Sequence, residues 1–289
     1  MKIQLTKRIV IATFSTVLGL LGLASGQLTA NADSFNTISR SDYVKTTRAM
    51  YTGQYYWNNG KRGSKIITPK GTILRNDGVG EDRTSTGSFK YSINLSRGDL
   101  HHDVEKHIDE TGRPIAFKSS DFKAYHPKMS VRTRVLQSGT GYTHDATNRY
   151  KPMFHITLDG YLEYYNSALL KKYQIYDPNE MNELRDLPNG SNTAFTPYYL
   201  NLIKPTASRK VSTYRIKGNS TYLYYSKPIY GLTEKKVSSH SYRLTITKQG
   251  PTFSKTWHNT DEDFTVAQWD RYTVGGHNFY DIISVENGD

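Results

Sequence analysis

The stretch "RGDLHHDVEKHIDE" at 97–110 is the densest group of chemistry-bearing side chains, with three of the nine histidines set among several acids. Residues four apart share one face of a helix, so Asp103 with His107, or His101 with Glu105, has the spacing of two metal ligands. No neighbouring motif supplies a third ligand, and the HExxH pattern of zinc proteases is absent. We therefore expect neither a metal nor another cofactor.

The same stretch begins with Arg97-Gly98-Asp99, a tripeptide known from cell adhesion. A loop glycine followed by a helix-capping aspartate explains these three residues equally well. Leu100, Val104 and Ile108 then recur every four residues and predict a buried stripe on a short helix. The other side chains of this helix are expected to face water, namely His101, His102, Asp103, Glu105, Lys106 and Asp109. The stretch is thus predicted to be a charged surface helix.

Other catalytic patterns are sparse. The chain has no cysteine, which excludes thiol catalysis, and it contains no GxSxG or Walker-type motif. Asp159 and Glu163 in "DGYLEYY" form a candidate carboxylate pair, but four residues on a strand span about 13 Å, too far for a glycosidase. We expect an exposed hairpin acid and an edge acid, and a protein that is not an enzyme. A secreted cell-wall hydrolase with an unrecognised active site is the enzymatic alternative.

The N-terminus predicts secretion. "MKIQLTKR" is basic, an apolar run follows, and "ANA" at 30–32 fits a cleavage site, so 1–32 is interpreted as a signal peptide. No later segment is apolar enough to span a membrane, and without cysteine the fold must be held by burial alone.

Charge and aromatic content indicate a polyanionic partner. The formal net charge is +12, and the segment 204–255 carries eleven Lys or Arg but one acid, whereas 257–289 carries seven acids and one Arg. A basic surface on a secreted protein favours polyanions such as teichoic acids. The 23 Tyr against 10 Phe suit half-exposed strands or a surface that stacks on sugar rings.

Short strand-like segments recur about every 80 residues and predict an all-β protein. Three of them end in glycine, namely "TTRAMYTG" at 46–53, "RTRVLQSG" at 132–139 and "STYRIKG" at 212–218. Three others alternate between apolar and polar residues, namely "FKYSINL" at 89–95, "MFHITLDG" at 153–160 and "YRLTITKQG" at 242–250. "PIAFKSSDF" at 114–122 parallels "YLEYYNSALL" at 161–170, and "IITPKGTIL" at 66–74 is a strand–turn–strand pattern.

A strand ending in glycine, a "PKGT" turn, an alternating strand and a closing strand with "SSDF" or "NSALL" resemble bacterial SH3-like modules. They are similar to the wall-binding repeats of secreted and surface-layer-type proteins of lactic acid bacteria. The resemblance covers most of 45–172 and part of 208–250. It implies tandem small SH3-like β-barrels that attach the protein to the cell wall without a covalent bond.

On this basis the chain divides into a signal peptide and three modules. Module one spans 33–125 with a helical insertion at 96–113, module two spans 126–175, a linker with a short helix at 177–188 spans 176–205, and a divergent third β module spans 206–289. The tail "WDRYTVGGHNFYDIISV" is expected to complete the third module, with Gly275-Gly276 as its turn.

The strongest binding candidate is "YLYYSKPIYGLTEKKVSSHSYRL" at 222–244, where aromatic rings alternate with cations. The predicted polymer-binding residues are Tyr222, Tyr224, Tyr225, Lys227, Tyr230, Lys235, Lys236 and Arg243. Rings stack on sugars, and Lys or Arg neutralises phosphates. Single-stranded nucleic acid needs the same chemistry, but the expected compartment favours an anionic wall polymer and no nucleic acid. We expect a secreted, wall-associated Gram-positive protein, and an adhesin for host glycans or matrix is the second alternative.

Overall fold

The computed structural model describes residues 35–288, with gaps at 59–60, 84, 86–88, 98–99, 110–112, 130, 133, 144–149, 174, 176–199, 201–202 and 259–263. The predicted signal peptide and the predicted helix at 177–188 lie outside the described residues. The chain forms two compact units. Unit 1 contains the described residues up to Thr52 together with 67–95 and 113–126, and unit 2 contains 53–66, 96–112 and 127–288.

Unit 1 is built on a five-stranded sheet of order β7-β5-β4-β1-β8. The strands are β1 (Tyr43–Thr46), β4 (Ile73–Arg83), β5 (Phe89–Ser96), β7 (Ile115–Ala116) and β8 (Phe122–Tyr125). Alternation along β5 buries Ile93 and Leu95, which pack with Val44 and Leu74 in one core. Arg48 donates two hydrogen bonds to Asp121, at 2.7 and 2.9 Å.

A second sheet has three strands, β2 (Met50–Asn58), β3 (Lys61–Thr68) and β6 (Ile108–Asp109), in the order β3-β2-β6. Both β2 and β3 contribute residues to each unit. Within unit 2, Tyr55 pairs with Asp109 and Tyr56 with Ile108, and Arg62 donates to the Asp109 carboxylate at 2.5 Å.

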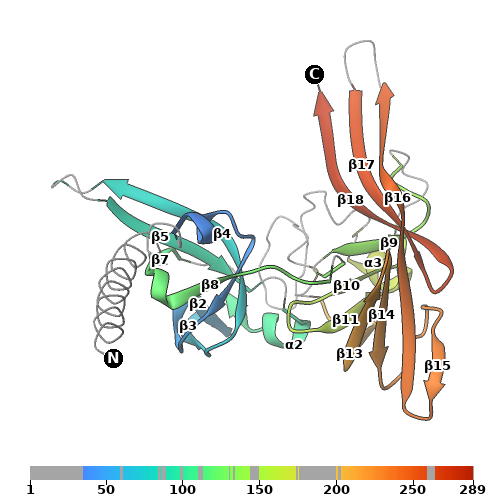
Figure 1. Ribbon diagram of the computed structural model, residues 1–289, viewed down its shortest axis with the longest axis horizontal. Coiled ribbons are helices and arrows are strands. Elements are labelled where there is room, and N and C mark those ends of the chain that lie inside the picture. Colours follow the sequence, from blue (N-terminus) through green and yellow to red (C-terminus); the bar gives the residue numbers. More distant parts are fainter. Residues whose placement is uncertain are drawn as a thin grey trace, which may run out of the picture. The chain divides into compact units, whose positions relative to one another are not determined.

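The main sheet of unit 2 has ten strands in the order β12-β11-β10-β9-β18-β17-β16-β14-β13, and β15 pairs with β16 (Figure 1). The strands are β9 (Val135–Ser138), β10 (Met153–Ile156), β11 (Tyr161–Tyr165), β12 (Ala207–Lys210), β13 (Thr213–Lys217), β14 (Ser220–Tyr225), β15 (Lys235–Ser238), β16 (Ser241–His258), β17 (Phe264–Val274) and β18 (His277–Gly288). The strands at the two ends of this path, β12 and β13, are consecutive in the sequence. The sheet therefore curls into a half-barrel.

The core of the half-barrel takes one apolar side chain from strand after strand. Phe154, Leu162, Leu223, Leu244 and Val274 are all buried in this single cluster. Their strands come from both the predicted second module (126–175) and the predicted third module (206–289). Neither of these two segments could therefore bury its apolar face without the other.

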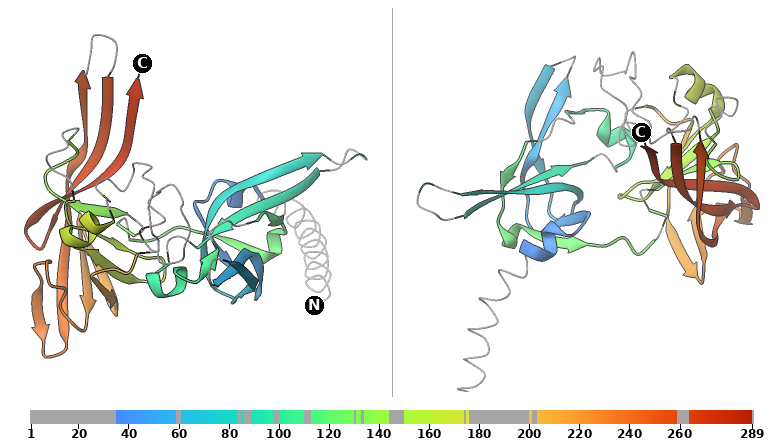
Figure 2. Two further views of the ribbon diagram at one scale, coloured as in Figure 1. Left: turned by 180° about the vertical axis from the view of Figure 1, so that it is seen from behind. Right: turned by 90° about the horizontal axis from the view of Figure 1, so that it is seen from above.

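β16, β17 and β18 extend from the half-barrel as a long antiparallel ribbon, seen from two sides in Figures 1 and 2. β17 and β18 meet at Gly275 and Gly276, whose φ angles of 58° and 92° suit a tight hairpin turn. A Cβ at Gly275 would lie 1.9 Å from the carbonyl oxygen of Thr233. The predicted turn is therefore present, and its glycine is required by both backbone and packing.

The all-β class is confirmed, but the predicted module boundaries differ from the observed units. The predicted second module (126–175) and third module (206–289) share one sheet, because β9 pairs with β10 on one side and β18 on the other. The predicted insertion 96–113 also lies largely in unit 2 rather than in the first module.

"NSALL" is a helix rather than part of a closing strand. α3 (Ser167–Lys172) begins after Asn166, whose side-chain oxygen accepts from the N–H of Leu169 at 2.9 Å. Leu170 on this helix is fully buried in a small cluster with Met153 and Tyr165. The asparagine cap was the signal in the sequence for this helix.

Candidate functional site

Alternation along β14 separates the predicted tyrosines onto two faces. Leu223 and Tyr225 point into the half-barrel core, whereas Tyr222 and Tyr224 lie half-buried on the opposite face. Residues directly opposite in an antiparallel pair share a face, so the partners of Tyr222 and Tyr224 belong to this surface as well. Those partners include Arg215 on β13 and Arg243 on β16.

Tyrosines and arginines on this surface are in direct contact. The guanidinium carbon of Arg243 lies 5.4 Å from the Tyr222 ring centre, and that of Arg215 lies 5.9 Å from the Tyr224 ring centre. Lys235 on β15 pairs with Arg243 and adds a further exposed cation. The structure thus brings together four of the predicted residues, Tyr222, Tyr224, Lys235 and Arg243.

The other four predicted residues lie elsewhere. Tyr225 is 1% exposed, and its hydroxyl donates to Glu234 at 2.7 Å. Burial and this hydrogen bond raise its pKa well above the usual value. Tyr225 is therefore a core residue, because the strand alternation turns it inward. Lys227 and Tyr230 are exposed on the turn after β14, and Lys236 pairs with Tyr242, which packs on the core side.

The same face continues along β16 beyond the range considered from the sequence. A bulge between Gln249 and Phe253 adds two extra residues to β16 opposite β17, an even number, so the odd-numbered residues stay on one side of the sheet. Phe253, Lys255 and Trp257 therefore follow Arg243 on this side. The alternation in "FSKTW" was the signal that could have revealed them.

Aromatic side chains of the ribbon contact one another on this side. Trp257 stacks on Trp269 with ring centres 6.3 Å apart, and Phe253 lies 4.7 Å from Trp269. Trp269 is almost fully buried, because the backbone at Gly141 packs directly against its indole ring. A Cβ at position 141 would lie 2.3 Å from the indole nitrogen, so only glycine allows this contact. The next residue, Tyr142, packs in an edge-to-face arrangement with Trp257, and the two ring centres are 5.6 Å apart.

Cations lie over these rings as well. The Lys255 ammonium is 4.8 Å from the Trp257 ring centre, and the Arg271 guanidinium carbon is 5.1 Å from that of Phe253. Such contacts contribute about 0.5–1 kcal/mol each at exposed sites. We call the whole surface the cation–aromatic face, made up of Arg215, Tyr222, Tyr224, Lys235, Arg243, Phe253, Lys255, Trp257 and Arg271, with the buried Trp269 packed against two of its rings.

Acids of the same strands point to the other side of the sheet. Asp270 and Asp281 are opposite one another on β17 and β18, both buried. Lys248 donates to Asp270 at 2.6 Å, and Arg134 donates to Asp281 at 2.9 Å. These carboxylates are neutralised within the fold, so they do not offset the cations of the cation–aromatic face.

The two buried acids titrate differently. Burial raises the pKa of Asp281 to about 6, because the ion pair with half-exposed Arg134 offsets only part of the desolvation. For Asp270 burial also acts to raise the pKa, but hydrogen bonds from Lys248 and Thr252 outweigh it and hold the pKa below the usual value.

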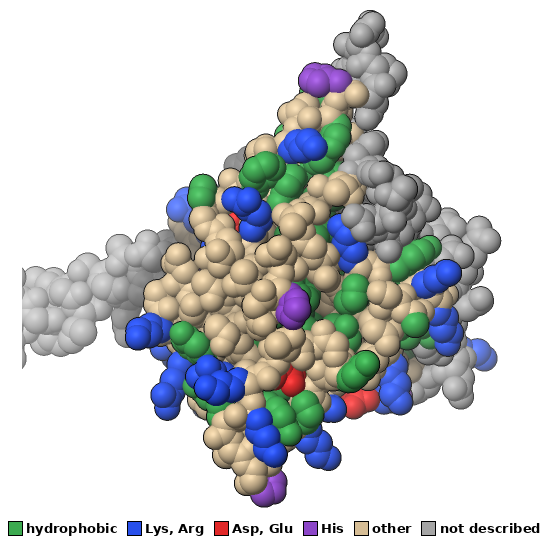
Figure 3. Space-filling model, turned by 90° about the vertical axis from the view of Figure 1, so that its right-hand side faces the viewer, with side chains coloured by type: hydrophobic (Ala, Val, Ile, Leu, Met, Phe, Trp, Pro, Cys, Tyr) green, Lys and Arg blue, Asp and Glu red, His purple; other side chains and the backbone are tan. Residues whose placement is uncertain are grey.

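On the side of the molecule drawn in Figure 3, Lys and Arg side chains are numerous and Asp and Glu side chains are few. Cations therefore outnumber acids on this one face.

The histidine-rich segment is a docked element rather than a solvated helix. α2 covers only His102–Glu105, begins after His101, and is followed by β6. His102, Glu105 and Asp109 are 7%, 0% and 5% exposed, so the prediction that they face water is wrong. Of the Arg-Gly-Asp tripeptide, Arg97 is buried, and Gly98 and the predicted cap Asp99 lie outside the described residues.

The segment is held by the two acids considered above as a carboxylate pair. The N–H groups of His101 and His102 donate to Asp159 and Glu163 at 3.2 and 3.1 Å, and the His101 ring also contacts the Asp159 carboxylate. The same ring stacks on Tyr161 with centres 3.9 Å apart.

Glu163 is fully buried, because β11 lies between β10 and β12 rather than at an edge. It also accepts from Ser208 Oγ at 3.1 Å and lies 3.2 Å from His155 Nε2. The expectation of an edge acid is therefore wrong. Asp159 and Glu163 both hold the start of α2 against β11 and the turn before it.

Within the described part of the chain, no group of three or more His, Asp or Glu is arranged to hold a metal ion. None of the helices in that part has the length and apolar character needed to cross a membrane.

Comparisons with protein-family models, with curated proteins and with solved structures find no match for this chain.

Proposed function

We propose that this chain is a secreted, non-enzymatic protein that associates with the Gram-positive cell wall by binding an anionic wall polymer, teichoic acid or wall polysaccharide. The observation that carries the proposal is the cation–aromatic face, where arginine and lysine side chains lie directly over tyrosine, phenylalanine and tryptophan rings. The basic, apolar and small-residue pattern of 1–32 supports secretion.

The chemistry of the face suits a sugar-phosphate polymer. Aromatic rings offer flat apolar surfaces to sugar rings, while Lys and Arg neutralise phosphates and release their counterions. Both groups recur along the 18 residues of β16, so an extended chain can make the same contact repeatedly. Many weak contacts along a line suit a polymer better than a small ligand.

Binding rather than catalysis is supported by the carboxylates. Asp159 and Glu163, the pair with the nearest sequence spacing to a glycosidase, are occupied by backbone N–H groups of α2 and its flank. Glu163 is also wholly buried.

The test is co-sedimentation of residues 33–289 with purified Gram-positive walls at low and high salt, before and after chemical removal of teichoic acid. We expect binding that falls with salt and is lost with the polymer. The matched variants are Arg215→Glu with Arg243→Glu on the face, and Lys45→Glu with Lys123→Glu on two exposed positions of unit 1. Both double variants change the net charge equally, so only a specific face separates them.

Three results would overturn the proposal. Absence of wall binding under every condition would remove it directly. Clearing of walls in a zymogram would instead indicate a hydrolase, and salt-resistant binding to host cells without wall binding would indicate an adhesin.

A further inference from the structure

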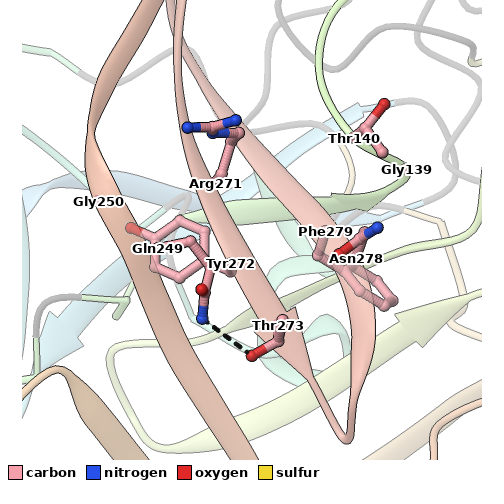
Figure 4. A pocket seen from close by; sticks show the side chains of 9 residues that line it. All are labelled: Gly139, Thr140, Gln249, Gly250, Arg271, Tyr272, Thr273, Asn278 and Phe279. Carbon is pink, nitrogen blue, oxygen red and sulfur yellow. Dashed lines mark hydrogen bonds between the residues drawn. The ribbon is translucent and has the colours of Figure 1, made fainter.

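The cation–aromatic face is interrupted by a pocket of about 370 Å³ beside the bulge of β16 (Figure 4). Between the pairs Gln249–Arg271 and Phe253–Trp269, β16 has three residues where β17 has one. The extra residues leave β17 and open a gap in the ladder. The segment after β9 forms another wall, and the N–H of Gly139 donates to the carbonyl of Asn278 at 2.8 Å.

The side chains at this pocket suit a hydroxyl-rich ligand. By register, Gln249, Arg271, Thr273 and Asn278 lie on the same side of the sheet, and Thr140 adds a further hydroxyl. Gln249 donates to Thr273 Oγ1 at 3.2 Å, which fixes the amide against the wall. Amides and hydroxyls can exchange hydrogen bonds with the hydroxyl groups of a sugar or polyol.

The pocket also favours an anion. Arg271 is the charged residue among those that line it, and none of these described residues carries a carboxylate. A guanidinium binds the oxygens of a phosphate through two parallel hydrogen bonds. The volume is near the lower end of the roughly 300–1,000 Å³ of small-molecule sites, which suits one unit rather than a long chain.

Arg271 joins the pocket to the rest of the face. It lines the pocket and also lies 5.1 Å from the Phe253 ring centre, next to Trp269 and Trp257. On the other flank, Thr273 pairs with Thr247, which pairs with Ser220 on β14, two residues from Tyr222. A polymer on the face would therefore pass over the pocket.

We propose that this pocket binds a single sugar or polyol unit that carries a phosphate, and that it selects which polymer the face retains. The proposal rests on the proposed function for the polymer, but binding of the unit itself can be measured separately.

The probes are glycerol 3-phosphate and glucose 1-phosphate, titrated into residues 33–289 and followed by NMR, with glycerol, glucose and inorganic phosphate as controls. We expect saturable shifts of the amide signals of Gly139, Gly250 and Thr273 with a phosphorylated probe, and at least about tenfold weaker binding of either part alone, since charged and neutral hydrogen bonds both contribute. Arg271→Gln and Thr273→Val should each weaken the phosphorylated probe. Lys45→Gln, at an exposed position of unit 1 outside the cation–aromatic face, should leave it unchanged.

Equal binding of inorganic phosphate alone, or the absence of any shift at these amides, would contradict the proposal that the pocket binds a phosphorylated sugar or polyol. Purified teichoic acid fragments should bind more tightly than the free unit, and equal affinity would identify a free metabolite rather than a polymer unit as the ligand.

The two proposals fail separately. Loss of wall binding in Arg215→Glu with Arg243→Glu, with probe binding retained, is the result expected if both hold. If the unmodified chain binds the probe but not the wall, only the proposed function is contradicted. If it binds the wall but not the probe, only the proposal for the pocket is contradicted.

Discussion

The guanidinium carbon of Arg243 lies 5.4 Å from the centre of the Tyr222 ring, diagonally across the β14–β16 pair. Both side chains turn away from the half-barrel core. The contact holds a cation over a flat ring at the surface, the arrangement that continues along β16 to Trp257. Five predictions concern this face and two buried carboxylates of the fold.

Charge reversal of the face should weaken wall binding and reduce its salt dependence. In Arg215→Glu with Arg243→Glu, the slope of log K against log salt should become shallower by about 1.5, because each of the two lost phosphate contacts removes roughly 0.7–0.9 from the slope. Sedimentation with walls at several salt concentrations measures the slope. The same loss in Lys45→Glu with Lys123→Glu would show that only net charge matters.

The two neighbouring lysines of β15 should behave differently. Lys235 pairs with Arg243 on the cation–aromatic face, whereas Lys236 pairs with core-packed Tyr242. Lys235→Glu should therefore weaken wall binding more than Lys236→Glu, in the same sedimentation assay. Equal effects would place the polymer at the edge of β15 rather than on the face.

Removing a ring should cost affinity without changing the salt slope. We expect Trp257→Ala to weaken wall binding about fivefold, the size of one lost aromatic contact of about 1 kcal/mol. Trp257 also packs on Trp269, so thermal unfolding of the variant must show that it remains folded. Tyr56→Ala, an exposed ring on the three-stranded sheet, is the control and should bind normally.

Glu163 should be a stability residue. Its buried carboxylate accepts from Ser208 Oγ and the His102 N–H, so Glu163→Gln places an amide N–H against one donor. We expect a loss of about 1–3 kcal/mol in the free energy of urea unfolding. Asp103→Asn, on the exposed side of α2, should have little effect. An unchanged midpoint for Glu163→Gln would contradict the anchoring role.

Asp281 should make stability fall as pH rises through the mildly acidic range. Its pKa is raised by burial from 3.8 to about 6, so between these values the folded state binds more protons than the unfolded state. Its contribution is therefore complete below about pH 4 and is lost as the pH rises through about 6. The free energy of unfolding of the unmodified chain minus that of Asp281→Asn should decline across this window, and parallel pH profiles would refute the raised pKa.

Local pattern in the sequence was sufficient for several strands, for one turn and for part of the candidate site. Period-two alternation predicted the segments that became β5, β10 and the first part of β16, and Gly275-Gly276 predicted the β17–β18 turn. The alternation of rings and cations at 222–244 singled out Tyr222, Tyr224 and Arg243, which share one surface of the sheet in the structure. These features depend on residues close together in the chain, where side-chain direction follows directly from backbone period.

Only the tertiary structure decided which alternate residues became core and which strands became neighbours. Tyr224 and Tyr225 are adjacent and alike, and the packing of the half-barrel alone turns Tyr225 inward. β9 and β18 pair although more than a hundred residues separate them, which merges the two predicted modules. The carboxylates that hold His101 and His102 likewise come from β11 and the turn before it. Such contacts depend on long-range burial, and no local pattern records the partner that a buried polar group will find.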